Sequence, residues 1–174
     1  MTNATQSPTT TTTTTTTQVY RVYIKATPEA IWDAITKPEW VDRYGYGGLP
    51  EYDLRPGAPY RVRAGSEMAA YEGVPEYVID GEIVEADPPR KLVQTWRMLM
   101  DPTMEAEGFT RLTHEIEAIE GAATKLTIIH ELEGAPTLAA MVAGESEAGG
   151  AGGGWAWVLS DLKSLLETGK RLAD

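Results

Sequence analysis

Two histidines are the side chains of this sequence best suited to acid–base chemistry. His114 lies two residues from both Leu112 and Ile116, and His130 lies two residues after Ile128, so each is a polar group on an otherwise apolar strand face. A histidine pair facing a cavity could orient a ligand carbonyl or act as general acid and base. Each imidazole could instead be hydrogen-bonded within the wall. Two histidines without a carboxylate partner are too few for a metal site, so we predict no metal and no cofactor.

Aromatic and sulfur-containing side chains supply a candidate apolar wall. Trp96 is in phase with Met98, and its ring could stack on a flat ligand or simply belong to the core. Met98, Met100 and Met104 gather around a predicted turn at Asp101. Methionine is flexible and polarizable, so these residues could line an adaptable site or fill gaps beside a loop.

Other patterns that suggest chemistry do not complete a known catalytic site. The glycine-rich residues 144–154 lack the Lys-Ser/Thr that follows a phosphate-binding loop, so this stretch is either a flexible lid at a cavity mouth or an inert linker. Asp80, Glu82 and Glu85 are typical of a solvated strand face. The sequence contains no Gly-x-Ser-x-Gly elbow and no evident Ser-His-Asp order, which favours a binding protein over an enzyme.

The elements that would position these residues follow from the sequence periodicity. Residues 18–25 are rich in β-branched and aromatic types and predict a strand. Thr27 is a suitable N-cap, Pro28 suits the first turn of a helix, and Pro38 begins a second short helix. Period-two patterns predict six further strands near residues 51–54, 59–64, 76–86, 90–99, 109–119 and 123–132. Their short links require antiparallel neighbours.

The last stretch of the sequence predicts a long amphipathic helix. Apolar residues recur at helical spacing, whereas Asp161, Lys163 and Glu167 lie off that stripe. The apolar face must cover the sheet, because no other surface is available. We therefore predict an α+β fold with the order βααββββββα, in which a curved antiparallel sheet wraps a C-terminal helix. The apolar stripe consists of Trp155, Val158, Leu159, Leu162, Leu165 and Leu166.

Composition narrows the classes of partner. The 174 residues carry a formal net charge of −11, which disfavours nucleic acids and anionic membrane surfaces. There is no cysteine, no signal peptide pattern and no apolar run long enough to span a bilayer, so we expect a cytoplasmic protein. Residues 1–17 are dominated by threonine and predict a disordered tail. Residues 18–171 would then form one domain.

Four segments in order resemble a known family. The element order is similar to the helix-grip fold of START-like (SRPBCC) proteins, and the motifs are closest to the branch named for the activator of the Hsp90 ATPase. No single segment is diagnostic, but together they cover residues 18 to 169. The matching segments are residues 22–32 with 36–39, the Leu-Arg-Pro-Gly at 54–57, residues 80–92 with 95–97, and residues 154–155 with 159–169.

This resemblance implies a cavity between the sheet and the C-terminal helix. Members of such folds bind lipids, polyketides or other apolar molecules, so we expect a small hydrophobic ligand. The alternatives are a cyclase, aromatase or hydrolase that uses His114 or His130, and an interaction module that regulates a chaperone. The residues expected to line the cavity are Trp96, Met98, Met100, His114, Ile116, Ile128, His130, Trp155, Leu159 and Leu162.

Overall fold

The computed structural model describes residues 16–121, 123–145, 147 and 152–172. Most of the predicted tail, residues 1–15, lies outside this part of the chain. The first strand begins at Thr17, one residue earlier than predicted. Thr17 therefore belongs to the folded domain and not to the tail.

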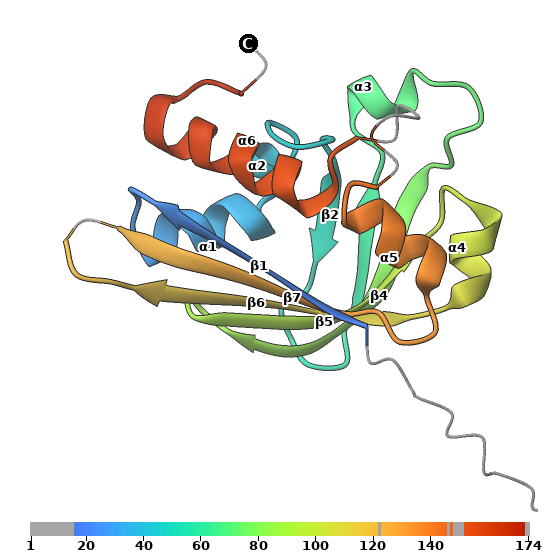
Figure 1. The fold of residues 1–174 in the computed structure, drawn as a ribbon, viewed down its shortest axis with the longest axis horizontal. Coiled ribbons are helices and arrows are strands. Elements are labelled where there is room, and N and C mark those ends of the chain that lie inside the picture. Colours follow the sequence, from blue (N-terminus) through green and yellow to red (C-terminus); the bar gives the residue numbers. More distant parts are fainter. Residues whose placement is uncertain (1–15, 122, 146, 148–151, 173–174) are drawn as a thin grey trace, which may run out of the picture.

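The described residues form one curved sheet with helices on its concave side (Figure 1). The strands are β1 (Thr17–Ile24), β2 (Leu49–Tyr52), β3 (Pro59–Arg63), β4 (Tyr77–Asp87), β5 (Lys91–Met98), β6 (Thr110–Ala118) and β7 (Thr124–Glu131). The helices are α1 (Pro28–Thr36), α2 (Pro38–Val41), α3 (Ser66–Ala69), α4 (Pro102–Glu107), α5 (Pro136–Val142) and α6 (Gly154–Thr168).

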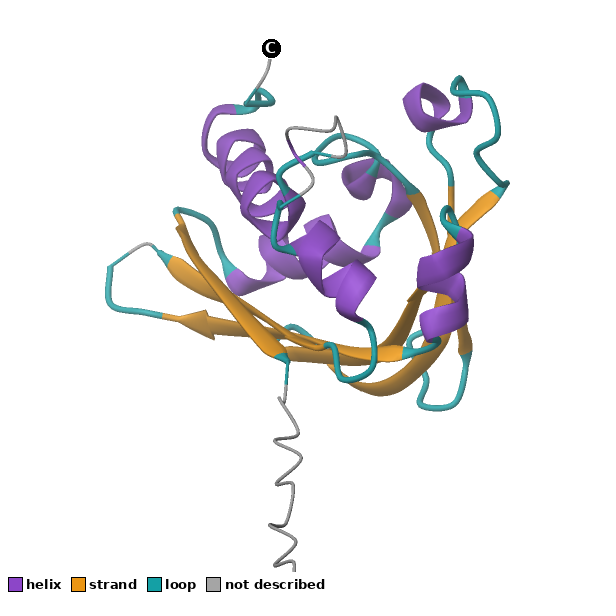
Figure 2. Ribbon diagram, turned by 45° about the vertical axis from the view of Figure 1, so that its right-hand side comes forward, coloured by secondary structure: helices purple, strands orange, loops and turns teal. Residues whose placement is uncertain are grey.

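The seven strands lie in the order β1-β7-β6-β5-β4-β3-β2, and every neighbouring pair is antiparallel. Among these neighbouring pairs, only β1 and β7 lie far apart in the sequence. Figure 2 shows the sheet curling around the helices, so that its concave face and the helices enclose the core. The predicted α+β class and curved antiparallel sheet are confirmed.

Local capping sets the helix boundaries. The Thr27 side chain accepts a hydrogen bond from the Ala30 N–H at 3.2 Å, and Pro28 occupies the first helical position, where no backbone donor is needed. α6 buries Leu159, Leu162 and Leu165 and ends at Gly169, whose φ of 77° suits the left-handed end of a helix. The Thr27 and Pro28 signals are thus used as predicted.

Three short helices and one strand boundary differ from the sequence prediction. The predicted order of elements contained no helix at the positions of α3, α4 and α5. α4 begins at an Asp-Pro pair, and the Asp101 carboxylate accepts hydrogen bonds from the N–H groups of Thr103 and Met104. β2 begins at Leu49 and contains Pro50, which an edge strand tolerates because its outer side needs no ladder donor.

A glycine in the middle of β4 allows the sheet to bend sharply. A Cβ atom at Gly81 would lie 2.0 Å from the carbonyl oxygen of Thr95 on β5. The register also shifts just beyond this point, between Ile83 and Glu85. Close backbone approach of this kind is one reason for glycine inside a strand. The bend carries β4, β3 and β2 around the helices and so opens space above the concave face.

Each helix in the described part of the chain is too short or too polar to cross a bilayer.

Candidate functional site

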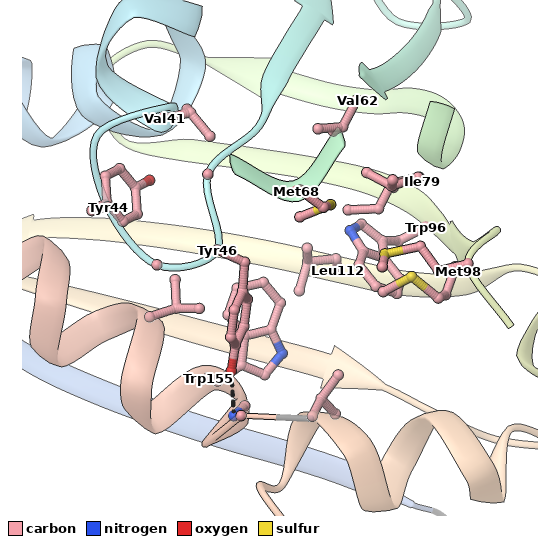
Figure 3. Close-up of a pocket in the computed structure, with 18 of the residues that line it drawn as sticks. Val41, Tyr44, Tyr46, Val62, Met68, Ile79, Trp96, Met98, Leu112 and Trp155 are labelled. Atoms are coloured by element: carbon pink, nitrogen blue, oxygen red, sulfur yellow. Dashed lines mark hydrogen bonds between the residues drawn. The ribbon is translucent and has the colours of Figure 1, made fainter. Parts of the chain in front are cut away.

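A cavity of about 790 Å³ lies between the concave face of the sheet and α6. Every strand from β2 to β7 contributes to its wall, together with the loop after α2 and parts of the helices. In Figure 3, Ile79, Trp96 and Met98 come from the strands, whereas Tyr46 and Trp155 approach from the loop and from α6. Exposed Tyr46, Tyr71 and Met100 mark its mouth. A cavity of this size accommodates a drug-sized molecule.

Eight of the ten residues predicted to line the cavity do so. They are Trp96, Met98, Met100, His114, Ile128, Trp155, Leu159 and Leu162. Ile116 and His130 do not line it. Ile116 is buried in the hydrophobic core, and His130 lies behind Trp155, which forms the wall in its place. Met104 also lines the cavity. Most of the glycine-rich stretch proposed as a lid lies outside the described residues.

A polar group in the wall comes from residues that the sequence analysis did not select. The Tyr52 hydroxyl donates a hydrogen bond to the side-chain oxygen of Gln94 at 3.1 Å. The Tyr52 ring stacks on that of Tyr60, with 4.7 Å between ring centroids. Burial raises the pKa of Tyr60 to about 12 and that of Tyr52 well above its ordinary value, so both remain neutral phenols near pH 7. Gln94 lies two residues before Trp96 in β5 and therefore on the same face of the strand. This spacing is the sequence signal that could have identified Gln94 as a residue of the wall.

His114 is a buried polar side chain that lines the cavity. Its exposed fraction is 7%, and its Nδ1 lacks a hydrogen bond in the part of the chain that the structure describes. The ring meets Trp155 edge-on, with 6.4 Å between centroids. Burial lowers the pKa of His114 to about 4, so the imidazole is neutral at pH 7. The Nδ1 atom has almost no accessible surface, so a ligand atom reaches it only after a small movement of the ring or of its neighbours.

His130 differs from His114 because both of its ring nitrogens are occupied. The indole N–H of Trp155 donates to Nδ1 at 3.2 Å, and Nε2 lies 2.9 Å from the Thr110 hydroxyl. Thr110 in turn donates to the carbonyl oxygen of Trp96 at 2.8 Å. These contacts require a neutral imidazole with its proton on Nε2. The geometry therefore leaves His130 no nitrogen for a substrate proton and makes it a support for Trp155.

The two buried histidines predict acid sensitivity. Burial, and secondly the nearby His114, lowers the pKa of His130 to about 3, while unfolded histidine titrates near 6.5. Between these values the unfolded chain binds a proton that the folded chain does not. The free energy of unfolding should therefore fall on acidification below about pH 6.5, by about 1.4 kcal/mol per histidine per pH unit.

Denaturant unfolding of His114→Leu across pH 7.5 to 4.5 checks this expectation. The substitution removes one of the two titrating groups and leaves an apolar side chain in its place. The pH slope below 6.5 should drop by about one bound proton relative to the unsubstituted chain. Identical slopes for the two proteins would contradict the proposed titration of His114.

The comparison with protein-family models gives one match. Residues 25–167 fit the model described as "Activator of Hsp90 ATPase homolog 1-like protein". The chain belongs to this family. The match includes all of the elements from α1 to α5 and nearly all of α6, so it encompasses the cavity. It also confirms the resemblance to the START-like (SRPBCC) superfamily inferred from the four segments.

Solved structures of the family and its relatives share the helix-grip fold. The Aha1 dimer from Colwellia psychrerythraea is 20% identical, with a TM-score of 0.60 over 89% of this chain and 98% of that one. DynU16, a protein of the dynemicin biosynthetic locus, is 22% identical, with a TM-score of 0.61 over 89% of this chain. This chain spans 48% of DynU16. An Hsp90 activator from Plasmodium falciparum is 22% identical, with a TM-score of 0.51 over 66% and 71% of the two chains. Comparison with the curated proteins gives no match.

In this family member, a buried carboxylate fixes the loop that closes one side of the cavity. Asp161 of α6 has an exposed fraction of 0% and accepts hydrogen bonds from the N–H groups of Gly45 at 2.8 Å and Leu172 at 2.5 Å. The Arg171 guanidinium lies 3.5 Å from the same carboxylate and donates to the Gly45 carbonyl at 3.1 Å. Asp161, which was predicted only to lie off the apolar stripe of the helix, is therefore buried nonetheless. Its carboxylate joins α6, the Gly45 loop and the end of the described chain.

The loop also places Tyr46 at the mouth of the cavity. The Gly154 N–H donates to the Tyr46 hydroxyl at 3.0 Å, as Figure 3 shows. A Cβ atom at Gly152 would lie 2.4 Å from that hydroxyl. Glycine at position 152 thus lets the tyrosine lie flat over the start of α6, where its ring forms part of the wall.

Proposed function

We propose that this chain binds a small hydrophobic molecule in the cavity between its sheet and α6. The observation that carries the proposal is a cavity of about 790 Å³ whose wall is mainly aliphatic, aromatic and methionine side chains, with a few polar groups. Empty apolar space of this size is costly in a core, since interiors otherwise pack to crystal-like density. Preformed apolar cavities with a few convergent polar groups are typical of ligand sites.

The nature of the wall favours a flat or aromatic ligand over a long flexible chain. Trp96, Trp155 and Tyr46 present ring surfaces, and aromatic pairs gain from offset or edge-on contact. Methionines at 68, 98 and 141 can adjust to its outline. The fold shared with a protein of the dynemicin biosynthetic locus supports a ligand of polyketide or aromatic type.

An enzymatic role for His114 is the second candidate, and its unpartnered Nδ1 is the observation that favours it. Two features weigh against it. A pKa of about 4 makes the imidazole a weak base at pH 7, and no carboxylate hydrogen-bonds to the ring to orient it in the described structure. Contact with a ligand is the role that the geometry supports better. A chaperone partner is suggested by the family description alone and not by any contact described above.

Filling the cavity should abolish ligand binding. Ile79→Trp places an indole ring into the space from β4, whereas Val19→Trp makes a similar change at an exposed position of β1. With 9-anthracenemethanol as fluorescent probe, we expect Ile79→Trp to weaken binding at least about tenfold, because a lost hydrophobic contact of ring size is worth more than 1.4 kcal/mol. Val19→Trp should bind as the unsubstituted chain does.

Native mass spectrometry of the same three proteins provides the complementary measurement. A bound small molecule should be retained by the unsubstituted chain and by Val19→Trp, and lost from Ile79→Trp. Equal binding by the folded Ile79→Trp variant would place the ligand elsewhere and end the proposal.

A further inference from the structure

The cavity lacks a cation. Among its described lining residues there is no lysine or arginine, and the two charged residues of the wall are the acids Glu67 and Asp101. The side chain of Glu67 is 80% exposed, so this charge lies at the mouth. Arg171, which pairs with Glu67 at 3.4 Å, is held outside the wall by its contacts with Asp161 and Gly45. The described lining of the cavity therefore contributes no positive charge of its own.

This charge arrangement disfavours anionic ligands. A carboxylate or phosphate that enters the cavity loses its water, and desolvation of an unpaired ion costs several kcal/mol. Repulsion from Asp101 at the wall adds to that cost, as does the formal net charge of −11. His114 does not offset it, because its imidazole is neutral at pH 7. Fatty acids and phospholipids are accordingly poor candidates for this site.

The floor of the cavity nevertheless offers polar groups to an uncharged ligand. Gln94 pairs with Leu112 across β5 and β6, and His114 is the next inward-facing residue of β6. Such diagonal neighbours have side chains within reach of one small molecule. Gln94 is already joined to Tyr52, whereas the Nδ1 of His114 has no partner within the described structure. The unsatisfied position is thus the imidazole.

A hydroxyl group is the best match to that position. A neutral imidazole has one N–H donor and one acceptor nitrogen, and a hydroxyl can pair with either, whereas a carboxylate can only accept. We infer that the ligand is an uncharged aromatic alcohol or phenol whose hydroxyl group hydrogen-bonds to His114. This inference rests on the proposed ligand-binding function and specifies its chemical class.

Three anthracenes of nearly equal shape test the inference in a fluorescence titration at pH 7.5. 9-Anthracenemethanol carries a hydroxyl, 9-anthracenecarboxylate carries a charge, and 9-methylanthracene carries neither. The alcohol should bind at least about tenfold more tightly than the carboxylate, because the carboxylate loses its water in the cavity without gaining a cationic partner. 1-Dodecanol and dodecanoate, used as competitors, extend the comparison to an aliphatic pair.

Variants of His114 test the named contact. His114→Leu should weaken the alcohol about five- to tenfold, the effect of one hydrogen bond, and leave the methyl compound unchanged or slightly tighter. His114→Gln retains a hydrogen-bonding group and should restore much of the preference for the alcohol. Thermal unfolding of each variant verifies that it is folded.

Each outcome separates the inference from the function on which it rests. Carboxylates that bind as tightly as the alcohols would overturn the inference while leaving the cavity as a ligand site. Equal losses for alcohol and methyl compound in His114→Leu would overturn the contact with His114. If none of the anthracenes or aliphatic compounds binds, the proposed function itself fails, and the inference fails with it.

Discussion

Replacing Asp161 by alanine is expected to lower the free energy of unfolding by about 3–5 kcal/mol, the range for breaking a buried, hydrogen-bonded charge pair. The substitution leaves the N–H groups of Gly45 and Leu172 without their acceptor and removes the carboxylate beside Arg171. A buried donor left unsatisfied contributes about 1–3 kcal/mol to the loss. Chemical denaturation monitored by circular dichroism measures this change.

Ser160→Ala is the matched control on the same helix. The Ser160 hydroxyl is exposed and donates only to the Ala156 carbonyl of its own helix. Its removal should change stability by less than about 0.5 kcal/mol. A loss for Asp161→Ala as small as that of the control would show that the carboxylate does not hold the Gly45 loop against α6. Ligand affinity should fall along with stability in Asp161→Ala, because that loop forms part of the cavity wall.

Gly81→Ala is expected to destabilise the protein by about 3 kcal/mol or more, in the upper range for overpacking of a well-ordered interior. The new methyl group would meet the Thr95 carbonyl at a distance that no Cβ atom tolerates. Since the neighbour is backbone, relief requires β4 and β5 to separate or the bend to straighten. The midpoint of denaturant unfolding gives the size of the effect.

Gly57→Ala distinguishes crowding from the general cost of replacing glycine. Gly57 has a φ of 84°, and a Cβ atom there would meet nothing within 4 Å. Its replacement should cost only about 1–2 kcal/mol of backbone strain. If Gly81→Ala were no more harmful than Gly57→Ala, the close approach of β4 and β5 would not be needed for the fold. Where Gly81→Ala does fold, the cavity should bind probes less tightly.

The fold was largely predictable because each long element repeats one simple pattern. The predicted ranges match six of the seven strands to within one residue at each end and β2 to within two, and Thr27 and Pro28 marked the start of α1. The short helices α3, α4 and α5 were missed, since four to seven residues are too few to establish a period of 3.6. α5 also lies in a region whose many glycines and alanines are typical of a loop.

The cavity wall was predictable only in part, because periodicity identifies a face and not a position along it. Ile116 and His130 lie on inward faces, yet other side chains separate them from the cavity. Tyr46 and Tyr52 also line the cavity, but Tyr46 lies in a loop and Tyr52 in an edge strand. No local sequence pattern indicates that this loop and this strand face β5. Asp161 shows the same limit, since its burial depends on a contact with Gly45, which lies more than a hundred residues away in the sequence.

Two of the five tryptophans of the chain, Trp96 and Trp155, face the space in which we expect the ligand to lie. The hydrogen bond from Trp155 to a neutral imidazole keeps that indole in one fixed environment while the cavity is empty. Arrival of a molecule beside the two indoles should shift or quench their ultraviolet emission, and an anthracene should accept excitation energy from them. The protein thus carries an intrinsic optical reporter of occupancy, which allows natural extracts to be screened without a label and without knowing the compound beforehand.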